Sequence, residues 1–549
     1  MSPRPSATTC SELIRAWARY APEDVALTFE GVHTTVAEFD GEVDRWARAL
    51  LAAGVQRGDA VSILCGNHPD FLRLSFAAAR VGAHLAPLNT WHKPEELRYT
   101  LDHSDAVVLL AVDRLRNQDF NAALATIIPE LTSAPAPDRF GRFPSLRQVV
   151  ALGSALPRAT PLGEFLRRAD EVGDAELHAR EKQNAPDDLM FLLYTSGSTS
   201  KPKAVQIHQG PLIENGYQIG ERQGIEPADR SWLATPLFYG LAAEQALMAA
   251  WTHRARVVLQ EVFDAPEALE ILARERCTVY YGFGNLTRKL LATPGFDRSR
   301  IHLRKGMIGF SVEDRQLAID RLGVTHGVSV YGMTEMYGLV ALTQHTDTRE
   351  TVLSTQGFPL PGNEIRIVDP DSETPLPQGE IGAIQVRGRV TTGYFKDSDR
   401  TKASFTGDGF FRTGDLGSLD AEGRLVYHAR ATEMLKPGGV NVAPQEIEAL
   451  LDEIPGIQQA HVCSVPDTRD GEVVVAFIEA DPEATPPELI RERMRARAAS
   501  YKVPRHFIYR SDAEMPRVAS GKIPRPLLRE EAARVLAAIP AGPASGVSS

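Results

Sequence analysis

The length of 549 residues exceeds what one hydrophobic core supports, so the chain is expected to fold into two or more domains. Hydrophobic residues make up 43% and charged residues 24% of the chain, which is typical of a globular protein and excludes a disordered or membrane-spanning one. The formal net charge of -11 argues against a general attraction to nucleic acid or anionic lipid, so any anionic ligand needs a local binding site.

The four cysteines lie far apart in the sequence and form no CxxC pair, which argues against a disulfide framework and a zinc knuckle. This pattern favours a reducing cytoplasm. Residues 1–9 lack the apolar segment of a signal peptide, and no stretch approaches the roughly 18 to 20 apolar residues of a membrane span. We therefore expect a cytoplasmic protein with no integral membrane segment and no nucleic-acid partner, and the sequence leaves a homodimer open.

Short β-rich runs alternate with helical patterns in the first part of the chain. Residues 60–65 and 105–112 are predicted strands, and a predicted helix at 71–82 lies between them. The alternation returns with strands at 256–260, 278–282, 307–310 and 326–332, and with helices at 266–276 and 312–323. This order is typical of βα units on a largely parallel sheet.

The pattern changes after residue 363. Short strands separated by Gly and Pro turns, at 364–368, 381–387 and 424–428, predict a small barrel or an antiparallel sheet. After residue 432, predicted helices at 444–451, 486–499 and 525–538 mix with strands at 460–465, 472–479 and 506–510. Roughly 110 residues in such an α+β pattern form a separate small domain. The Ala-, Gly- and Ser-rich residues 541–549 are predicted to be a disordered tail.

The segment 194–203, Tyr-Thr-Ser-Gly-Ser-Thr-Ser-Lys-Pro-Lys, carries the most chemical information. It follows an apolar run at 189–193, which predicts a loop that leaves a strand. Its hydroxyls, amides and lysines suit the oxygens of a polyphosphate, although a soluble linker has a similar composition and the GxxxxGK[ST] pattern is absent. The candidate phosphate-binding residues are Thr195, Ser196, Gly197, Ser198, Thr199 and Lys203.

A second candidate site is the segment 331–335, which begins where a predicted strand ends. Ligands gather at the carboxyl ends of strands in α/β sheets. The Tyr331 ring can stack on a base, the Thr334 hydroxyl can contact a phosphate, and the Glu335 carboxylate can hold Mg²⁺. A plain turn at the edge of a strand is the alternative.

Two further segments carry charged candidates. Asp415 follows Thr-Gly and precedes Tyr427 and Arg430, and an ionised Asp accepts the two hydrogen bonds that a ribose diol offers. Lys522 lies in a glycine-bearing turn with few acidic neighbours. Taken alone, the first segment also fits a turn and the second a solvated basic surface.

Together and in this order, these segments resemble the adenylate-forming superfamily of acyl- and aryl-CoA synthetases, beetle luciferases and peptide-synthetase adenylation domains. The resemblance covers nearly the whole chain and includes residues 49–67, 82–89, 400–415 and 438–448. It implies an α/β fold with a large N-terminal domain of layered αβ sheets, a small distorted β-barrel, and a small mobile α+β C-terminal domain. The implied boundaries are 1–431 for the adenylation domain and 432–540 for the mobile domain that carries the catalytic lysine.

In this superfamily a carboxylate oxygen attacks the α-phosphorus of ATP and pyrophosphate leaves. Two anions must meet, so catalysis depends on positioning and charge neutralisation. By resemblance, the loop from Thr195 to Lys203 would hold the outer phosphates, Thr334 the α-phosphate and Glu335 Mg²⁺. Tyr331 would stack on adenine, and Lys522 would bridge the carboxylate and the phosphate. The residues at the ribose would be Asp415, Tyr427 and Arg430.

The resemblance also implies a second half-reaction. The small domain would turn about a hinge at Thr432 and present Gly438 and Gly439, which leave a channel for the pantetheine arm of coenzyme A. Thiol attack on the acyl-adenylate would then give the thioester and AMP. The hinge carries Thr432 in place of the customary Asp or Lys.

The predicted acid pocket departs from the usual pattern of the superfamily. Tyr239, after Phe238, stands where many acyl- and aryl-CoA synthetases have His, and the segment with Phe283 and Gly284 lacks a common proline. No aspartate lies beside Phe238, which disfavours an α-amino acid. We predict an acid–CoA ligase. Alternatives are an amide-forming ligase, an enzyme that adenylates an oxyanion such as nitrite for N–N bond formation, and a non-catalytic nucleotide sensor.

Overall fold

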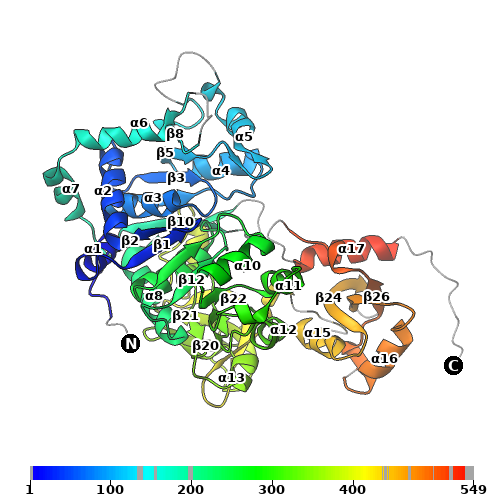
Figure 1. The fold of residues 1–549 in the computed structure, drawn as a ribbon. Coiled ribbons are helices and arrows are strands. Elements are labelled where there is room, and N and C mark those ends of the chain that lie inside the picture. The colour runs from blue at the N-terminus through cyan, green and yellow to red at the C-terminus, as the bar shows by residue number, and fades with distance from the viewer. Residues whose placement is uncertain are drawn as a thin grey trace, which may run out of the picture. The chain divides into compact units, whose positions relative to one another are not determined.

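The structure is a computed structural model that describes most of the chain. The described residues are 4–132, 140–153, 158–195, 202–433, 435, 437, 442, 444–467, 471–498, 500–518 and 523–537. Their contacts form two compact units (Figure 1). The first unit consists of 1–365, 386–411 and 423–425, and the second of 366–385, 412–422 and 426–549. Part of the predicted first domain thus belongs to the second unit, and the boundary after residue 431 stays a prediction.

One seven-stranded sheet of the first unit has the order β16-β15-β14-β12-β13-β1-β2. Its neighbouring strands are parallel except for β1 and β2, so the predicted parallel βα arrangement is confirmed. The strands are β1 (Val25–Phe29), β2 (Val32–Thr35), β12 (Arg230–Leu233), β13 (Arg256–Leu259), β14 (Val279–Tyr281), β15 (Lys305–Met307) and β16 (His326–Val328). The helices α10 (Ala265–Arg274) and α12 (Val312–Leu317) connect them where the sequence predicted helices.

The other seven-stranded sheet has the order β11-β10-β4-β3-β5-β8-β9. It ends in an antiparallel hairpin of β10 and β11, and its other neighbouring strands are parallel. The strands are β3 (Ala60–Leu64), β4 (His84–Pro87), β5 (Ala106–Ala111), β8 (Gln148–Ala151), β9 (Thr160–Pro161), β10 (Leu189–Thr195) and β11 (Lys203–His208). Helix α3 (Pro69–Arg80) joins β3 to β4.

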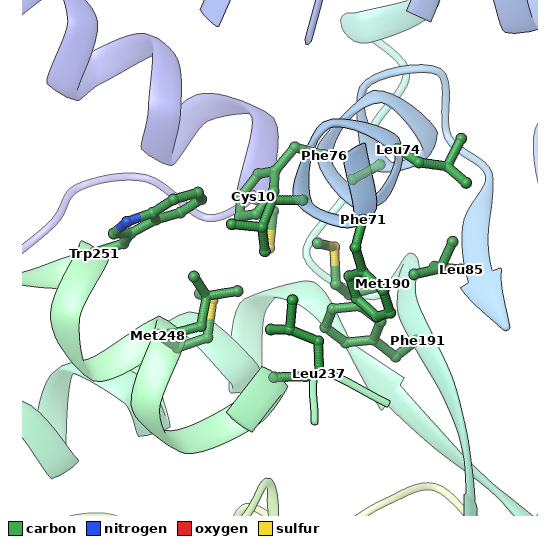
Figure 2. Packing of buried hydrophobic residues seen from close by; sticks show 14 of the residues in the cluster. Cys10, Phe71, Leu74, Phe76, Leu85, Met190, Phe191, Leu237, Met248 and Trp251 are labelled. Carbon is green, nitrogen blue, oxygen red and sulfur yellow. The ribbon is translucent and has the colours of Figure 1, made fainter. Parts of the chain in front are cut away.

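Helices and strands of both sheets share one hydrophobic core (Figure 2). Helices α1 (Cys10–Tyr20), α2 (Val36–Ala52) and α9 (Leu247–Thr252) contribute to it. The Trp251 ring lies 5.0 Å from the ring centroids of both Phe39 and Phe76. Leu85 of β4 and Phe191 of β10 pack in the same cluster. Aromatic side chains bury a large apolar area, so this core holds the two sheets in one unit.

A charged network lies beside this core. Arg80 of α3 is completely buried and bonds to Asp40 at 2.5 Å and to Asp44 at 2.8 Å, both from α2. Its Nε donates to Ser11 of α1 at 2.9 Å. Arg15 of α1 also bonds to Asp44 at 2.7 Å. A buried guanidinium is tolerated only when it is paired, so this network determines how the three helices meet.

The strands between residues 364 and 430 form a separate four-stranded sheet in the order β20-β21-β22-β23. The strands are β20 (Glu364–Val368), β21 (Gly382–Arg387), β22 (Phe411–Leu419) and β23 (Leu425–Arg430). The order leaves β20 and β23 at the edges. Closure would require these two strands to pair, so the described strands form an open sheet in place of the predicted distorted barrel.

The C-terminal residues form the predicted α+β arrangement. Strand β24 (Ile457–Asp467) is antiparallel to β25 (Gly471–Ala480), and β26 (His506–Tyr509) is parallel to β25. Helices α15 (Pro444–Asp452), α16 (Pro487–Arg495) and α17 (Arg525–Ala537) accompany them. Within the described residues, no helix combines the length and the apolar character needed to cross a membrane.

We predict that Arg80→Met lowers the free energy of unfolding of the first unit by about 3 kcal/mol, because it removes a buried cation from its pairs with Asp40 and Asp44 and leaves these carboxylates with Arg15 alone. Chemical denaturation followed by tryptophan fluorescence measures this change. Arg48→Met is the matched control, since the partner Asp174 is 79% exposed at its side chain, and its expected cost is below about 1 kcal/mol. Equal costs for the two variants would contradict the role assigned to Arg80.

Candidate nucleotide and acid site

The predicted phosphate loop begins and ends in the β10–β11 hairpin. Thr195, the last residue of β10, pairs with Lys203, the first residue of β11. The predicted residues Ser196, Gly197, Ser198 and Thr199 lie outside the described residues. Thr195 Oγ1 is buried and has no hydrogen-bond partner within the described part of the chain. Buried hydroxyls are usually paired, so this one is suited to a ligand oxygen.

Lys203 and Glu335 form a partly buried ion pair in the first unit. Lys203 Nζ lies 2.6 Å from Glu335 Oε1, and Glu335 is 4% exposed. The Tyr394 hydroxyl donates to the same carboxylate oxygen at 2.8 Å and accepts from Lys203 Nζ at 3.1 Å. Burial, followed by the charge of Glu335, raises the pKa of Tyr394 well above its usual range. The phenol therefore stays a proton donor to Glu335.

Asn215 positions the turn that carries Glu335. Strand β17 (Val330–Tyr331) leads into a short 3₁₀ turn at Thr334–Met336. Asn215, buried in α8 (Gln209–Gln223), donates through Nδ2 to the carbonyls of Tyr337 at 2.9 Å and Leu339 at 2.8 Å. Tyr337 has a φ of 52°, so the carbonyls of Tyr337 and Leu339 lie outside the regular hydrogen-bond pattern of a helix or strand and need this side-chain donor. The sequence analysis missed Asn215 because it precedes the turn by more than a hundred residues.

Thr334 and Tyr331 differ in their exposure. Thr334 is half-buried, and its Oγ1 lies 3.2 Å from the point where a Cβ on Gly240 would lie. This proximity brings Thr334 next to the predicted acid pocket. Tyr331 is 5% exposed and pairs in its strand with Ala341. Stacking on adenine requires an accessible ring face, so that role of Tyr331 stays a prediction.

Aromatic rings gather at the predicted acid pocket. The Trp91 ring lies 5.5 Å from Phe238 and 5.4 Å from Tyr239. Asn89 Nδ2 donates to the Tyr239 hydroxyl at 3.3 Å, and burial raises the pKa of Tyr239. Buried Asn67 fixes this segment, because its side chain accepts from Leu237 N at 2.8 Å. Sequence reasoning missed Trp91, which follows Asn89 by two residues.

Phe283 and Gly284 lie where the strand β14 is followed by helix α11 (Gly284–Ala292). Phe283 is half-buried and stacks on Phe310, with ring centroids 6.4 Å apart. A Cβ on Gly284 would overlap the Asp314 carboxylate, so a larger residue there would require the Asp314 side chain to move. Phe310 is 52% exposed, which makes this aromatic pair an accessible apolar surface.

The predicted ribose residues meet within the second unit. Arg430 Nε lies 3.0 Å from Asp415 Oδ1, and Asp415 is 3% exposed. Arg430 Nη1 also donates to the carbonyl of Thr413 at 3.2 Å. Tyr427, on the adjacent strand β23, is half-buried, and burial followed by the charge of Asp415 raises its pKa. Adjacent strands thus bring together residues that are separated in sequence.

The predicted catalytic Lys522 and the pair Gly438 and Gly439 lie outside the described residues. The side chain of the hinge residue Thr432 lies outside them as well. Arg525 begins α17 shortly after Lys522 and bonds to both oxygens of Glu448 in α15, at 2.8 and 2.9 Å. This bidentate pair anchors the segment that follows Lys522.

The chemistry of Glu335 fits a magnesium ion. Mg²⁺ is commonly bound through one or two carboxylates together with phosphates and water. Glu335 supplies one such carboxylate beside Thr334. Among the described residues, no group of three or more His, Cys, Asp or Glu side chains is arranged to hold a metal.

The α/β sheets, the hydroxyl- and lysine-bearing hairpin and the Asp–Arg cluster define a nucleotide-binding enzyme. The chain belongs to the AMP-binding enzyme family, whose model matches residues 14–395, and the model of the AMP-binding enzyme C-terminal domain matches 446–522. The predicted family membership is confirmed. Phosphate-loop candidates and Glu335 lie in the first matched region, and Lys522 is the last residue of the second.

The alignments with similar proteins span almost the whole chain. The putative acyl-CoA synthetase YngI of Bacillus subtilis is 30% identical over 534 residues, which span 95% of this chain and 97% of YngI. The ATP-bound crystal structure of MatB from Rhodopseudomonas palustris is 26% identical, with a TM-score of 0.77 over 96% of this chain and 99% of MatB. The amide bond synthetase McbA from Marinactinospora thermotolerans is 25% identical, with a TM-score of 0.77 over 95% of this chain and 99% of McbA.

We predict that Tyr394→Phe weakens ATP binding about tenfold, because a hydrogen bond to a charged group contributes about 1.5 kcal/mol. The variant removes the hydroxyl that holds Glu335 and Lys203 while it keeps the ring. Titration calorimetry with ATP and Mg²⁺ measures the affinity. Tyr217→Phe is the control, since Tyr217 stacks on His253 outside the site. Unchanged affinity in the Tyr394 variant would remove this residue from the site.

Proposed function

We propose that the protein activates a carboxylic acid with ATP, releases pyrophosphate, and transfers the acyl group from the acyl-adenylate to coenzyme A. The contact between Lys203 and Glu335, beside Thr334 and next to the predicted acid pocket, is the observation that supports it. The reaction brings a carboxylate to a phosphate, so its barrier depends on charge neutralisation and alignment. These residues supply a cation, a hydroxyl donor and a metal ligand in one place.

Each group has a role in this proposal. Lys203 and the hairpin hydroxyls hold the outer phosphates, and Thr334 donates to the α-phosphate. Glu335 holds Mg²⁺, which would neutralise phosphate charge when it is bound. Tyr331 contacts adenine, while Asp415, Tyr427 and Arg430 hold the ribose. The two oxygens of an ionised Asp415 carboxylate suit the two hydroxyls of a diol.

The aromatic residues of the predicted acid pocket indicate the general class of acid. Trp91, Phe238 and Tyr239 form one aromatic cluster, and Phe283 with Phe310 forms another. Aromatic walls favour an acid with a flat or apolar body. Tyr239, in place of the His common in related synthetases, has a hydroxyl that accepts a hydrogen bond from Asn89.

Coenzyme A is the proposed acceptor, with Gly438 and Gly439 at its channel. An amine acceptor is the second candidate, and the similarity to the amide bond synthetase McbA supports it. Adenylation of an oxyanion such as nitrite would use the same first step. We further propose a cytoplasmic location, because the cysteines form no disulfide among the described residues.

A panel of carboxylic acids and nitrite with ATP tests the function. Pyrophosphate release identifies the substrate. AMP formation and the mass of the product are then measured in reactions that contain coenzyme A, an amine, or neither acceptor. We expect an acyl-CoA thioester that requires coenzyme A. A product formed only with amines would select the amide ligase, and no pyrophosphate with any substrate would contradict the adenylation proposal.

We predict that Lys522→Ala lowers the rate of pyrophosphate release at least about a hundredfold, because one charged contact made in the transition state contributes about 3 kcal/mol. ATP affinity is expected to persist, since the phosphate and ribose contacts remain. Arg534→Ala is the control, because Arg534 lies near the end of α17 and is 77% exposed at its side chain. An unchanged rate in the Lys522 variant would remove the catalytic role.

A further inference from the structure

Glu244 is a buried carboxyl that the proposed chemistry has not used. It lies in a six-residue π-helical turn, Leu241–Ala246, directly after the aromatic segment of the acid pocket. The residue is completely buried. Neither of its carboxyl oxygens has a hydrogen-bond partner within the described part of the chain. A buried polar group without a partner costs free energy, and π-helical turns are frequent at functional sites, so Glu244 requires an explanation.

The position of Glu244 points to Thr334. A Cβ on Gly240 would overlap Glu244 Oε2, and Thr334 Oγ1 lies 3.2 Å from the same point. The absent side chain of Gly240 therefore leaves a small space that the carboxyl and the hydroxyl share. Both groups therefore border the space that a Cβ on Gly240 would fill.

The surroundings of Glu244 favour its neutral form. Burial raises the pKa of Glu244 well above the usual value, and the negative charge of Glu335 adds to the increase. A neutral carboxyl has an O–H donor that an ionised one lacks. It also avoids repelling a phosphate anion that approaches Thr334. These properties suit a group behind a phosphate-binding hydroxyl.

We propose that Glu244 is a positioning residue for adenylation: it hydrogen bonds to Thr334 Oγ1 and directs the Thr334 hydroxyl proton toward the α-phosphate. This inference rests on the proposed function, because it assigns Glu244 to the same site. The carboxyl touches neither the acid nor the nucleotide. It acts through Thr334, whose hydroxyl then has one defined orientation when the phosphorus is attacked. A fixed donor costs no reorganisation during the reaction.

The experiment compares Glu244→Met with Glu244→Gln. Met fills a similar volume without a hydrogen-bonding head, whereas the amide of Gln can donate to Thr334 Oγ1. We expect Met to lower kcat for pyrophosphate release about tenfold with little change in KM, and Gln to restore most of that loss. Both variants are measured at saturating ATP and acid.

A double-mutant cycle with Thr334→Val separates positioning from packing. Without the Thr334 hydroxyl, the Met substitution should cause no further loss in kcat, because the interaction it removes is already absent. Gln209→Met is the packing control. Gln209 lies in α8 and, like Glu244, has a completely buried polar side chain. Thermal unfolding of each variant reports its folding. Glu244→Asp, which withdraws the carboxyl by one methylene, replaces the Met variant if that variant does not fold.

Two results would overturn the inference. Equal losses for Met and Gln would show that the hydrogen-bonding head is irrelevant. Additive losses with Thr334→Val would show that Glu244 acts independently of that hydroxyl. Failure of the wild-type protein to release pyrophosphate is a separate outcome, because it would contradict the proposed function before any variant is compared.

Discussion

The ion pair between Lys203 and Glu335 is the interaction on which the site depends. It joins the end of one seven-stranded sheet to a turn that follows strand β17, across 132 residues of sequence. Glu335 is nearly buried, and a buried carboxylate without a cation is strongly unfavourable. The pair therefore determines how closely the hairpin approaches the turn. Tyr394 completes the contact, and Asn215 keeps the turn in the conformation that presents Thr334.

Two buried glutamates near Thr334 differ in their surroundings. Glu335 has a cation and a phenol as partners, whereas Glu244 has neither within the described residues. The difference follows from the elements that carry them, since the turn faces the lysine of the hairpin and the π-helical turn packs among apolar side chains. Burial raises the pKa of Glu244, whereas the Glu335 carboxylate has the Lys203 ammonium at 2.6 Å.

The predicted site residues are divided between the two compact units. The predicted phosphate and acid residues belong to the first unit, and the predicted ribose residues Asp415, Tyr427 and Arg430 belong to the second. Arg525, bound to Glu448, anchors the segment after Lys522 within the second unit. The pairs Lys203–Glu335 and Arg525–Glu448 each hold the local geometry within one unit.

The sequence alone determined the family, the parallel βα core, the α+β C-terminal region and most site candidates, because these depend on local periodicity and on short motifs. Thr334, Glu335 and Asp415 were therefore named as candidates without a structure, and their roles stay predictions. Only the tertiary structure revealed Tyr394, Asn215, Trp91 and Glu244 and replaced the predicted barrel with an open sheet. Those features depend on contacts between residues far apart in the chain, and no local pattern encodes which distant side chain will fill a given space.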